Sequence, residues 1–169
     1  MNILEKRDLY DCNRNLTGET IYKGEKIPKN RYILVVLCFI QNSKGEFLIQ
    51  KRSMIKNGKY GATGGHPKSG ESSLEGMLTE INEEIGLSIL PNEINLIFSG
   101  VEHSSQVFFD LYYLKKDFDI NNLTLQKEEV DFVDWYSLDK IELLIKNNLF
   151  FENHVEELYR VLDYLKNKN

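Results

Sequence analysis

The chain has 169 residues, of which 41% are hydrophobic, and its formal net charge at pH 7 is -5. This length and composition predict one domain over residues 1–169 with a sizeable core, and the negative balance argues against binding extended nucleic acid through the phosphate backbone. No apolar run approaches about eighteen residues and the N-terminus has no recognisable signal peptide, so we expect a cytoplasmic protein with no membrane partner.

The predicted elements begin with an N-terminal lead-in, residues 1–30, that holds a short hairpin and a connector. Residues 8–10 and 16–22 are extended runs on either side of an Asn-rich turn, and such a hairpin would cover an edge of a main sheet. Residues 31–41, RYILVVLCFIQ, are almost continuously apolar, which predicts a central strand buried on both faces. Residues 46–52 follow across a turn as its hairpin partner.

Strands and helices continue through the rest of the chain. We expect, in order, a loop at 53–59, a helix at 73–85 ended by Gly86, a short strand at 88–90, a strand pair at 95–102 and 106–115, a loop at 116–125, a strand at 130–135, a helix from Ser137 or Asp139 to about Lys146, and a last amphipathic helix capped by Asn153. This order predicts an α+β fold, in which a mixed β-sheet lies between helices.

The helix expected at residues 73–85 separates apolar from acidic side chains. At about 100° per residue, Glu80, Glu83 and Glu84 fall within one arc. The neighbouring arc is apolar and carries Leu74, Met77, Leu78, Ile81 and Ile85. Three carboxylates at this spacing repel one another, and a hard divalent cation such as Mg²⁺ or Mn²⁺ would offset the repulsion. The pattern predicts a helix that docks on the sheet and presents a metal site, with a solvated acidic face as the alternative.

Residues 65–87, GHPKSGESSLEGMLTEINEEIGL, follow the pattern G-x5-E-x7-T-E-I-x-E-E-x-G-L. This resembles the Nudix box, G-x5-E-x7-R-E-U-x-E-E-x-G-U with U apolar, at every specified position except Thr79. The family carries an arginine there that helps to hold the catalytic glutamates by charge pairing, which threonine cannot do. Lys51, Lys56 or another cation from elsewhere in the fold is a candidate replacement. The resemblance implies a Nudix domain, an α/β/α sandwich with a catalytic loop-helix-loop.

The resemblance also implies a role for each box glutamate. Glu83 and Glu84 match the main metal ligands, and Glu80 matches either a further ligand or the group that activates water. Glu71 matches an outer member that braces the helix or joins the metal shell. The main-chain carbonyl of Gly64, just before the box, matches a usual extra ligand, and a glycine there lets the main chain approach closely.

Side chains outside the box complete the expected site. Nudix enzymes often recruit one more carboxylate from a distant loop, and Glu128 and Glu129 are both candidates, with a solvated charged turn as the alternative. The candidates for binding phosphate are basic residues shortly before the box: Lys51, Arg52 and Lys56. His66, inside the box, is a candidate ligand or substrate contact, whereas we expect turn placement for His103 and a surface position for His154.

The first half of the chain and the passage at 128–138 resemble the isopentenyl-diphosphate-isomerase-like branch of the superfamily. The isomerases use a catalytic cysteine where this chain has Gly64, and metal-binding histidines from the strand before the box, where residues 31–41 have none. We therefore expect a Mg²⁺- or Mn²⁺-dependent hydrolase in which metal-activated water cleaves a diphosphate linkage of a nucleoside-diphosphate-X type or related small molecule.

Two other functions remain open at this point. One is isopentenyl diphosphate isomerase, and the other is a catalytically weak Nudix domain that binds a nucleotide-diphosphate ligand. Thr79 is the feature that favours the weak domain, and the intact glutamates of the box oppose it. Dimerisation is common in the family, so a homodimer is a candidate assembly.

Overall fold

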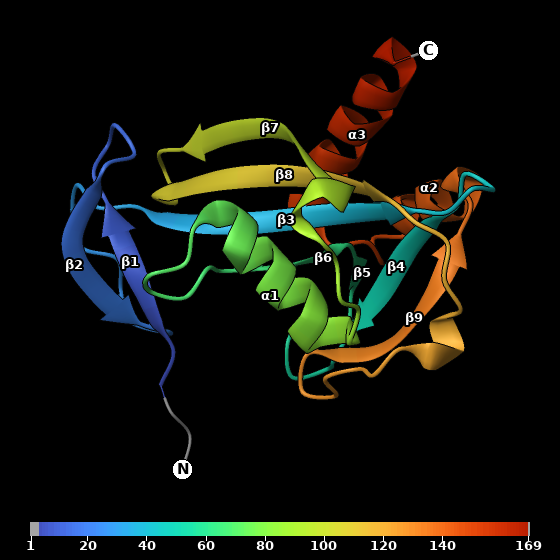
Figure 1. The fold of residues 1–169 in the computed structure, drawn as a ribbon, viewed down its shortest axis with the longest axis horizontal. Helices are drawn as coiled ribbons and strands as arrows, with labels where there is room; N and C mark the ends of the chain where they lie inside the picture. The colour runs from blue at the N-terminus through green and yellow to red at the C-terminus, as the bar shows by residue number, and fades with distance from the viewer. Residues whose placement is uncertain (1–3, 169) are drawn as a thin grey trace.

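A computed structural model describes residues 4–168 (Figure 1). The strands are β1 (Lys6–Tyr10), β2 (Leu16–Tyr22), β3 (Ile33–Gln41), β4 (Phe47–Arg52), β5 (Tyr60–Gly61), β6 (Thr63–Gly65), β7 (Ile94–Glu102), β8 (Val107–Lys115) and β9 (Val130–Tyr136). The helices are α1 (Ser73–Ile85), α2 (Leu138–Lys146) and α3 (Val155–Asn167), with 3-10 turns at Pro91–Glu93, Ile120–Asn122 and Glu152–His154. Within the described residues, no helix combines the length and the apolar character that crossing a membrane requires.

The main sheet has seven strands and is built around β3. β8 lies parallel to β3, while β4 and β6 pair with it antiparallel. β7 extends the sheet beyond β8, and β5 and β9 pair with β4. The two hairpins predicted from the sequence, β3–β4 and β7–β8, are both present, and the sheet is mixed as expected.

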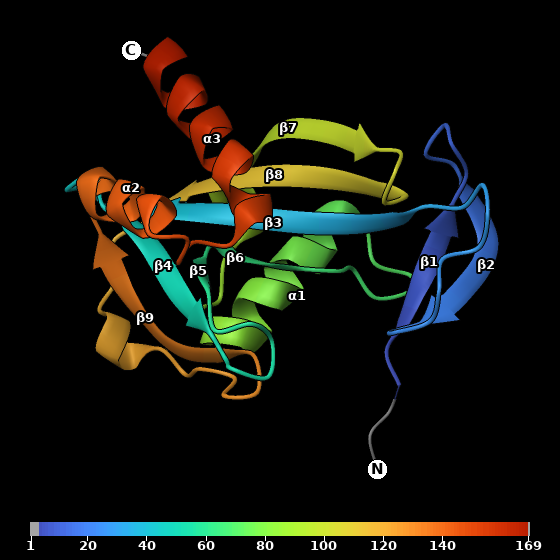
Figure 2. The ribbon, with the colours of Figure 1, turned by 180° about the vertical axis from the view of Figure 1, so that it is seen from behind.

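Alternating residues of β3 face two separate cores. Val36 and Cys38 belong to the core that contains the apolar side of α1. Leu37 and Phe39 belong to the core that α2 and α3 cover. Figure 1 shows α1 in front of the sheet, and the opposite view in Figure 2 shows α2 and α3 in front. The predicted α+β fold, with a mixed sheet between helices, is therefore confirmed. The helical layers on both sides are what bury the two faces of β3.

The lead-in hairpin is present, but it stands at one end of the main sheet (Figure 1). β1 and β2 pair antiparallel as a separate two-stranded sheet. An isolated bridge between Tyr10 and Tyr32 joins this hairpin to the chain just before β3, and Leu9, Ile21 and Ile33 form a small core at the junction. The hairpin therefore meets the main sheet where β3 begins, rather than along an outer strand such as β7 or β9.

Two local predictions are wrong. In the described chain, residues 88–90 form no strand, because Leu90 leads into a 3-10 turn and its N–H donates to the Glu93 carboxylate at 2.7 Å. Pro91 begins that turn with a fixed φ. Asn153 does not cap α3, since it lies exposed inside a 3-10 turn that precedes the helix. Short apolar runs and single capping residues are weak signals, and the neighbouring turns overrode them.

Candidate active site

Hydrogen bonds at both ends fix the acidic helix α1. The Ser72 hydroxyl accepts a bond from the Glu75 N–H at 3.1 Å, and the Glu75 carboxylate accepts one from the Ser72 N–H at 2.8 Å. Gly86 ends the helix at a φ of 71°, where glycine has no steric cost. Met77 and Ile81 are fully buried against the sheet. The predicted helix and its bounds are therefore confirmed, and docking of the apolar side sets the direction of the carboxylates.

Two carboxylates of the box, Glu80, which is half-buried, and Glu84, which is buried, are called here the inner pair. Glu84 is 5% exposed and accepts a hydrogen bond from the Gln50 amide at 3.1 Å. Burial raises the pKa of Glu84 to about 8, and the charges of Glu80 and Glu129 add to the rise. Burial likewise raises the pKa of Glu80 to about 7, with the charge of Glu83 adding to it. Two carboxylates held together in this way favour binding a cation or accepting a proton.

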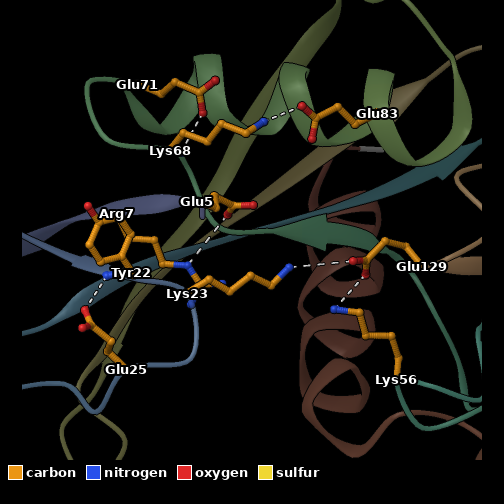
Figure 3. Close-up of polar contacts among 10 residues, drawn as sticks. All are labelled: Glu5, Arg7, Tyr22, Lys23, Glu25, Lys56, Lys68, Glu71, Glu83 and Glu129. Carbon is orange, nitrogen blue, oxygen red and sulfur yellow. Dashed lines mark hydrogen bonds and ion pairs between the residues drawn. The ribbon is translucent and has the colours of Figure 1, made fainter. Parts of the chain in front are cut away.

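Glu71 and Glu83, the other two glutamates of the motif, each have a polar partner from within the box. Glu71 accepts hydrogen bonds from the Thr79 hydroxyl at 2.8 Å and from the Lys68 N–H at 2.8 Å. Glu83 is paired with the Lys68 ammonium group (Figure 3). Thr79 therefore braces Glu71 through a neutral hydrogen bond, while the positive charge beside these glutamates comes from other side chains.

Glu129 lies across from α1, between two lysines (Figure 3). Its carboxylate oxygens are 3.0 Å from Lys56 Nζ and 3.8 Å from Lys23 Nζ. Its charge raises the pKa of Glu84, so it lies within electrostatic range of the inner pair. Glu128 is exposed to solvent. Of the two carboxylates that the sequence left open, the structure brings Glu129 to the site and leaves Glu128 outside it.

The three basic candidates also separate. Arg52 lies within electrostatic range of Glu84 and Glu129, whose charges oppose the lowering of its pKa by burial, and its guanidinium lies 4.3 Å from the centre of the Phe151 ring. Lys56 joins the site through its ion pair with Glu129. Lys51 instead pairs at 3.1 Å with an aspartate of β9, the strand beside its own. Arg52 and Lys56 are thus brought together with the carboxylates, and Lys51 is not.

His66 lies in the loop before α1, and its imidazole is neutral. Burial lowers its pKa to about 3, and the positive charges of Arg7, Lys23 and Lys56 lower it further. A main-chain hydrogen bond from His66 reaches Glu80 and opposes the rise of its pKa. His66 therefore carries no charge at neutral pH, and its main chain contributes to holding the inner pair.

The other two histidines have structural contacts. His103 lies in the turn between β7 and β8, as expected, with its Nδ1 2.8 Å from the Tyr32 hydroxyl. The surface position expected for His154 is wrong. Its Nδ1 accepts a hydrogen bond from the Ala62 N–H at 3.1 Å, and burial lowers its pKa to about 3. The start of the last helix docks on the chain between β5 and β6, which no local pattern indicates.

The glycines of β6 allow close approach of other groups to the main chain. A side chain at Gly65 would overlap the Glu80 carboxyl group. A side chain at Gly64 would overlap the main chain of β3 at Val36, with which β6 is paired. Gly64 is therefore required by strand packing, whatever its carbonyl binds, and Gly65 is the glycine that makes room for the inner pair.

The donor groups of this site suit a hard divalent cation. Among residues 4–168, no three His, Cys, Asp or Glu side chains already stand in a metal-binding arrangement. The inner pair nevertheless offers carboxylate oxygens whose pKa values are raised by burial and by neighbouring negative charge. Oxygen donors of this kind match Mg²⁺ or Mn²⁺. Glu83 and Glu129 could join them once their lysine contacts open.

Some residues of the site were not expected from the sequence. Lys68 lies inside the box, and its position three residues before Glu71 was a usable signal. Lys23 and Gln50 carry no local signal, because they reach the carboxylates only through strand pairing and loop docking.

A protein-family model described as NUDIX domain matches residues 31–158. A Nudix hydrolase of Listeria innocua is 36% identical over 163 residues, which cover 92% of this chain and 95% of the relative. A Nudix hydrolase of Listeria monocytogenes is 35% identical over 151 residues, which cover 87% of this chain and 88% of the relative. These matches extend well beyond the box itself.

Solved structures share the fold at low sequence identity. A Deinococcus radiodurans protein aligns with a TM-score of 0.75 at 22% identity, over 92% of this chain and 98% of the other. The NUDIX domain of Shewanella oneidensis NrtR, crystallised with ADP ribose, aligns with a TM-score of 0.63 at 16% identity, over 79% of this chain and 88% of the other. The arrangement of helices around a mixed sheet is therefore shared with these proteins.

Proposed function

This chain belongs to the NUDIX domain family, and on that basis we propose that it is a hydrolase that uses Mg²⁺ or Mn²⁺ to cleave a diphosphate linkage in a nucleoside-diphosphate-X type or related small molecule. The observation that carries the proposal is the inner pair, Glu80 and Glu84. Positive charge lies near this pair on Arg52 and on Lys56, which is paired with Glu129. A diphosphate suits both the acidic and the basic groups of such a site. Metal ions bound by the carboxylates would neutralise its charge, and its oxygens would accept hydrogen bonds from arginine and lysine.

Each carboxylate takes a distinct part in the proposal. Glu83 and Glu84 are the main ligands of the cation, with Glu129 and the carbonyl of Gly64 as further ligands. When bound, the cation would neutralise the diphosphate and make a water molecule more acidic. Glu71 braces α1 through the hydrogen bond from Thr79.

Glu80 is the proposed proton acceptor. Its pKa of about 7 lies close to neutral pH, where a general base is most effective. In the reaction, the oxygen of water forms a bond to phosphorus as the bridging P–O bond breaks. The leaving phosphate keeps the electron pair of that bond, and the proton of water passes to the Glu80 carboxylate. Arg52 and Lys56 would bind the phosphate oxygens on which negative charge accumulates.

The two alternatives have less support. An isomerase of the branch that the chain resembles would carry a cysteine at position 64, where a side chain would overlap the main chain of β3. The weak binding domain rests on Thr79, whose hydroxyl donates to Glu71 at 2.8 Å and so keeps a brace in place. Hydrolysis is the function that uses the remaining carboxylates.

The proposal is tested by measuring phosphate and monophosphate release from a panel of diphosphates with Mg²⁺ or Mn²⁺. The panel contains ADP-ribose, dinucleoside polyphosphates, nucleoside triphosphates, nucleotide sugars and isopentenyl diphosphate. We expect turnover of one class that is lost in Glu83→Gln and kept in Glu142→Gln, an exposed glutamate of α2. Double-bond migration without phosphate release would identify the isomerase. Metal binding without turnover of any compound in the panel would favour the binding domain.

A further inference from the structure

Arg7, on strand β1 of the lead-in hairpin, is a largely buried cation that the proposed reaction does not use. Its side chain is 13% exposed, and its Nε has no hydrogen-bond partner among the residues from 4 to 168. The nearest carboxylate oxygen in an ion pair belongs to Glu5, at 3.9 Å, beyond hydrogen-bond distance. Burying a guanidinium is unfavourable unless negative charge compensates it. The position of Arg7 therefore calls for an electrostatic partner.

The loop of the box is fastened to β1 on both sides of Arg7. The Ser69 N–H donates to the Lys6 carbonyl at 2.9 Å. The Ser69 hydroxyl and the Gly70 N–H donate to the two oxygens of Asp8, at 2.6 and 2.9 Å. These bonds fix the hairpin against the loop that leads into α1, so Arg7 is held at a set place beside the box.

Two box glutamates share the surroundings of Arg7. Arg7, Lys68 and Glu71 line the same cavity of about 10 Å³. Burial lowers the pKa of Arg7, and the negative charges of Glu5 and Glu80 oppose that lowering. Glu71 thus lines a cavity together with this guanidinium, and Glu80 lies within electrostatic range of it.

The helix itself has no cation at this place. Residue 79 is a threonine, which gives Glu71 a neutral hydrogen bond. Lys68 is already paired with Glu83 (Figure 3). We propose that Arg7 is a positioning residue of the box: from the lead-in hairpin it supplies the positive charge that holds Glu71 and Glu80, in place of a charged side chain at position 79. The hairpin is then part of the active site.

The expected effect of Arg7 on turnover rests on the proposed function. The electrostatic interaction of Arg7 with the box glutamates does not, because it is expected in the metal-free protein. The first experiment therefore needs no substrate. It measures the melting temperature of the metal-free full chain for the wild type, Arg7→Met, Glu80→Gln and the double variant. Lys6→Met is the matched control, because Lys6 is an exposed cation on the same strand.

We expect Arg7→Met to lower the melting temperature by about 4 °C in the wild type and by less than about half of that in the Glu80→Gln background, because the partner charge is then gone. Lys6→Met should shift the melting temperature by less than about 1 °C. Equal losses from Arg7→Met in the two backgrounds would overturn the proposal, since Arg7 would then contribute packing alone.

The second experiment moves the charge back to the helix. On a compound that the wild type hydrolyses, we expect Arg7→Met to lower kcat about 10- to 100-fold with little change in KM, and Arg7→Lys to lower it less. Adding Thr79→Arg to Arg7→Met should restore most of the loss, which a general folding defect would not allow. Failure of Thr79→Arg to restore turnover would overturn the positioning role. If the wild type hydrolyses none of the compounds, the proposed function fails. The melting experiment still shows whether Arg7 interacts with Glu80.

Discussion

Asp110 and Glu84 are the two carboxylates that are buried in the described chain, and their pKa values are shifted in opposite directions. Asp110, on β8, accepts hydrogen bonds from three side chains: Arg14 at 2.7 Å, Ser73 at 2.5 Å and Ser99 at 2.7 Å. Although burial acts to raise the pKa of Asp110, these partners hold it below its usual range. Glu84 has the amide of Gln50, and its pKa rises to about 8.

The difference separates a structural carboxylate from a reactive one. Asp110 connects the turn of the lead-in hairpin through Arg14, the start of α1 through Ser73, and β7 through Ser99. Its oxygens are occupied, so it has little capacity to bind a ligand. Glu84 is buried with less compensation, which leaves an unfavourable charge that a bound cation would relieve. Burial alone therefore does not identify an active-site acid, whereas burial without sufficient partners does.

The largest expected effect removes the structural carboxylate. Asp110→Asn should lower the free energy of unfolding by about 3 to 5 kcal/mol, because it leaves the guanidinium of Arg14 without its countercharge. Urea denaturation measures this change. The control is Asp163→Asn on the exposed side of α3, for which we expect a change below about 0.5 kcal/mol. A loss below about 1 kcal/mol for Asp110→Asn would contradict the structural role.

The reverse pattern is expected for the reactive carboxylate. Glu84→Gln should lower kcat/KM about 100- to 1,000-fold, because a metal ligand is lost. The free energy of unfolding of the metal-free protein should stay the same or rise, because a poorly compensated buried charge becomes a neutral amide. Kinetics and urea denaturation at pH 8 test both parts. A stability loss like that of Asp110→Asn would show that Glu84 is a structural residue after all.

The smallest expected effect is a pH dependence of opposite sign at the two sites. Glu80 and Glu84 have folded pKa values of about 7 and about 8, above the ordinary value of 4.5, so the folded metal-free protein binds more protons than the unfolded chain. Its free energy of unfolding should therefore fall as pH rises, by about 2 kcal/mol between pH 6.5 and pH 8. The lowered pKa of Asp110 acts in the other direction: its contribution is present above pH 4 and is lost as pH falls further.

Denaturation at several pH values measures both slopes. His66 and His154 have pKa values lowered to about 3, so at these two positions the unfolded chain binds more protons near pH 6.5 than the folded protein, and the resulting rise in stability up to about pH 7.5 offsets part of the fall. The double variant Glu80→Gln, Glu84→Gln should remove the fall between pH 6.5 and pH 8, and Mn²⁺ should raise the melting temperature more at pH 8 than at pH 6.5. An equal fall in the double variant would assign the effect to other groups.

The main elements of the fold could be predicted from the sequence because each has a strong periodic signal. The helix at Ser73–Ile85 could be predicted because apolar residues recur on one face and a glycine follows the last turn. β3 was recognised as central because nearly every residue is apolar. The strand at 88–90 was wrong because a run of three residues has no periodicity with which to oppose the adjacent turn.

Several site residues could not be predicted because their roles depend on segments distant in the chain. Glu128 and Glu129 are neighbours of the same type, and the fold alone gives Glu129 the partners Lys23 and Lys56. Lys51 and Arg52 are likewise adjacent, and the alternation of a strand sends one toward an aspartate of β9 and the other toward the inner pair.

The sequence by itself determined the chemistry of this protein: four glutamates at fixed spacing between glycines, on a helix with one apolar face. These features depend on covalent order and helical geometry, which are local. The tertiary structure decided which carboxylates are buried without sufficient partners and which cations lie beside them, including Arg7 and Lys23 from the lead-in hairpin. Burial and the distances between charges depend on how the helices and strands pack, so the local sequence does not determine them.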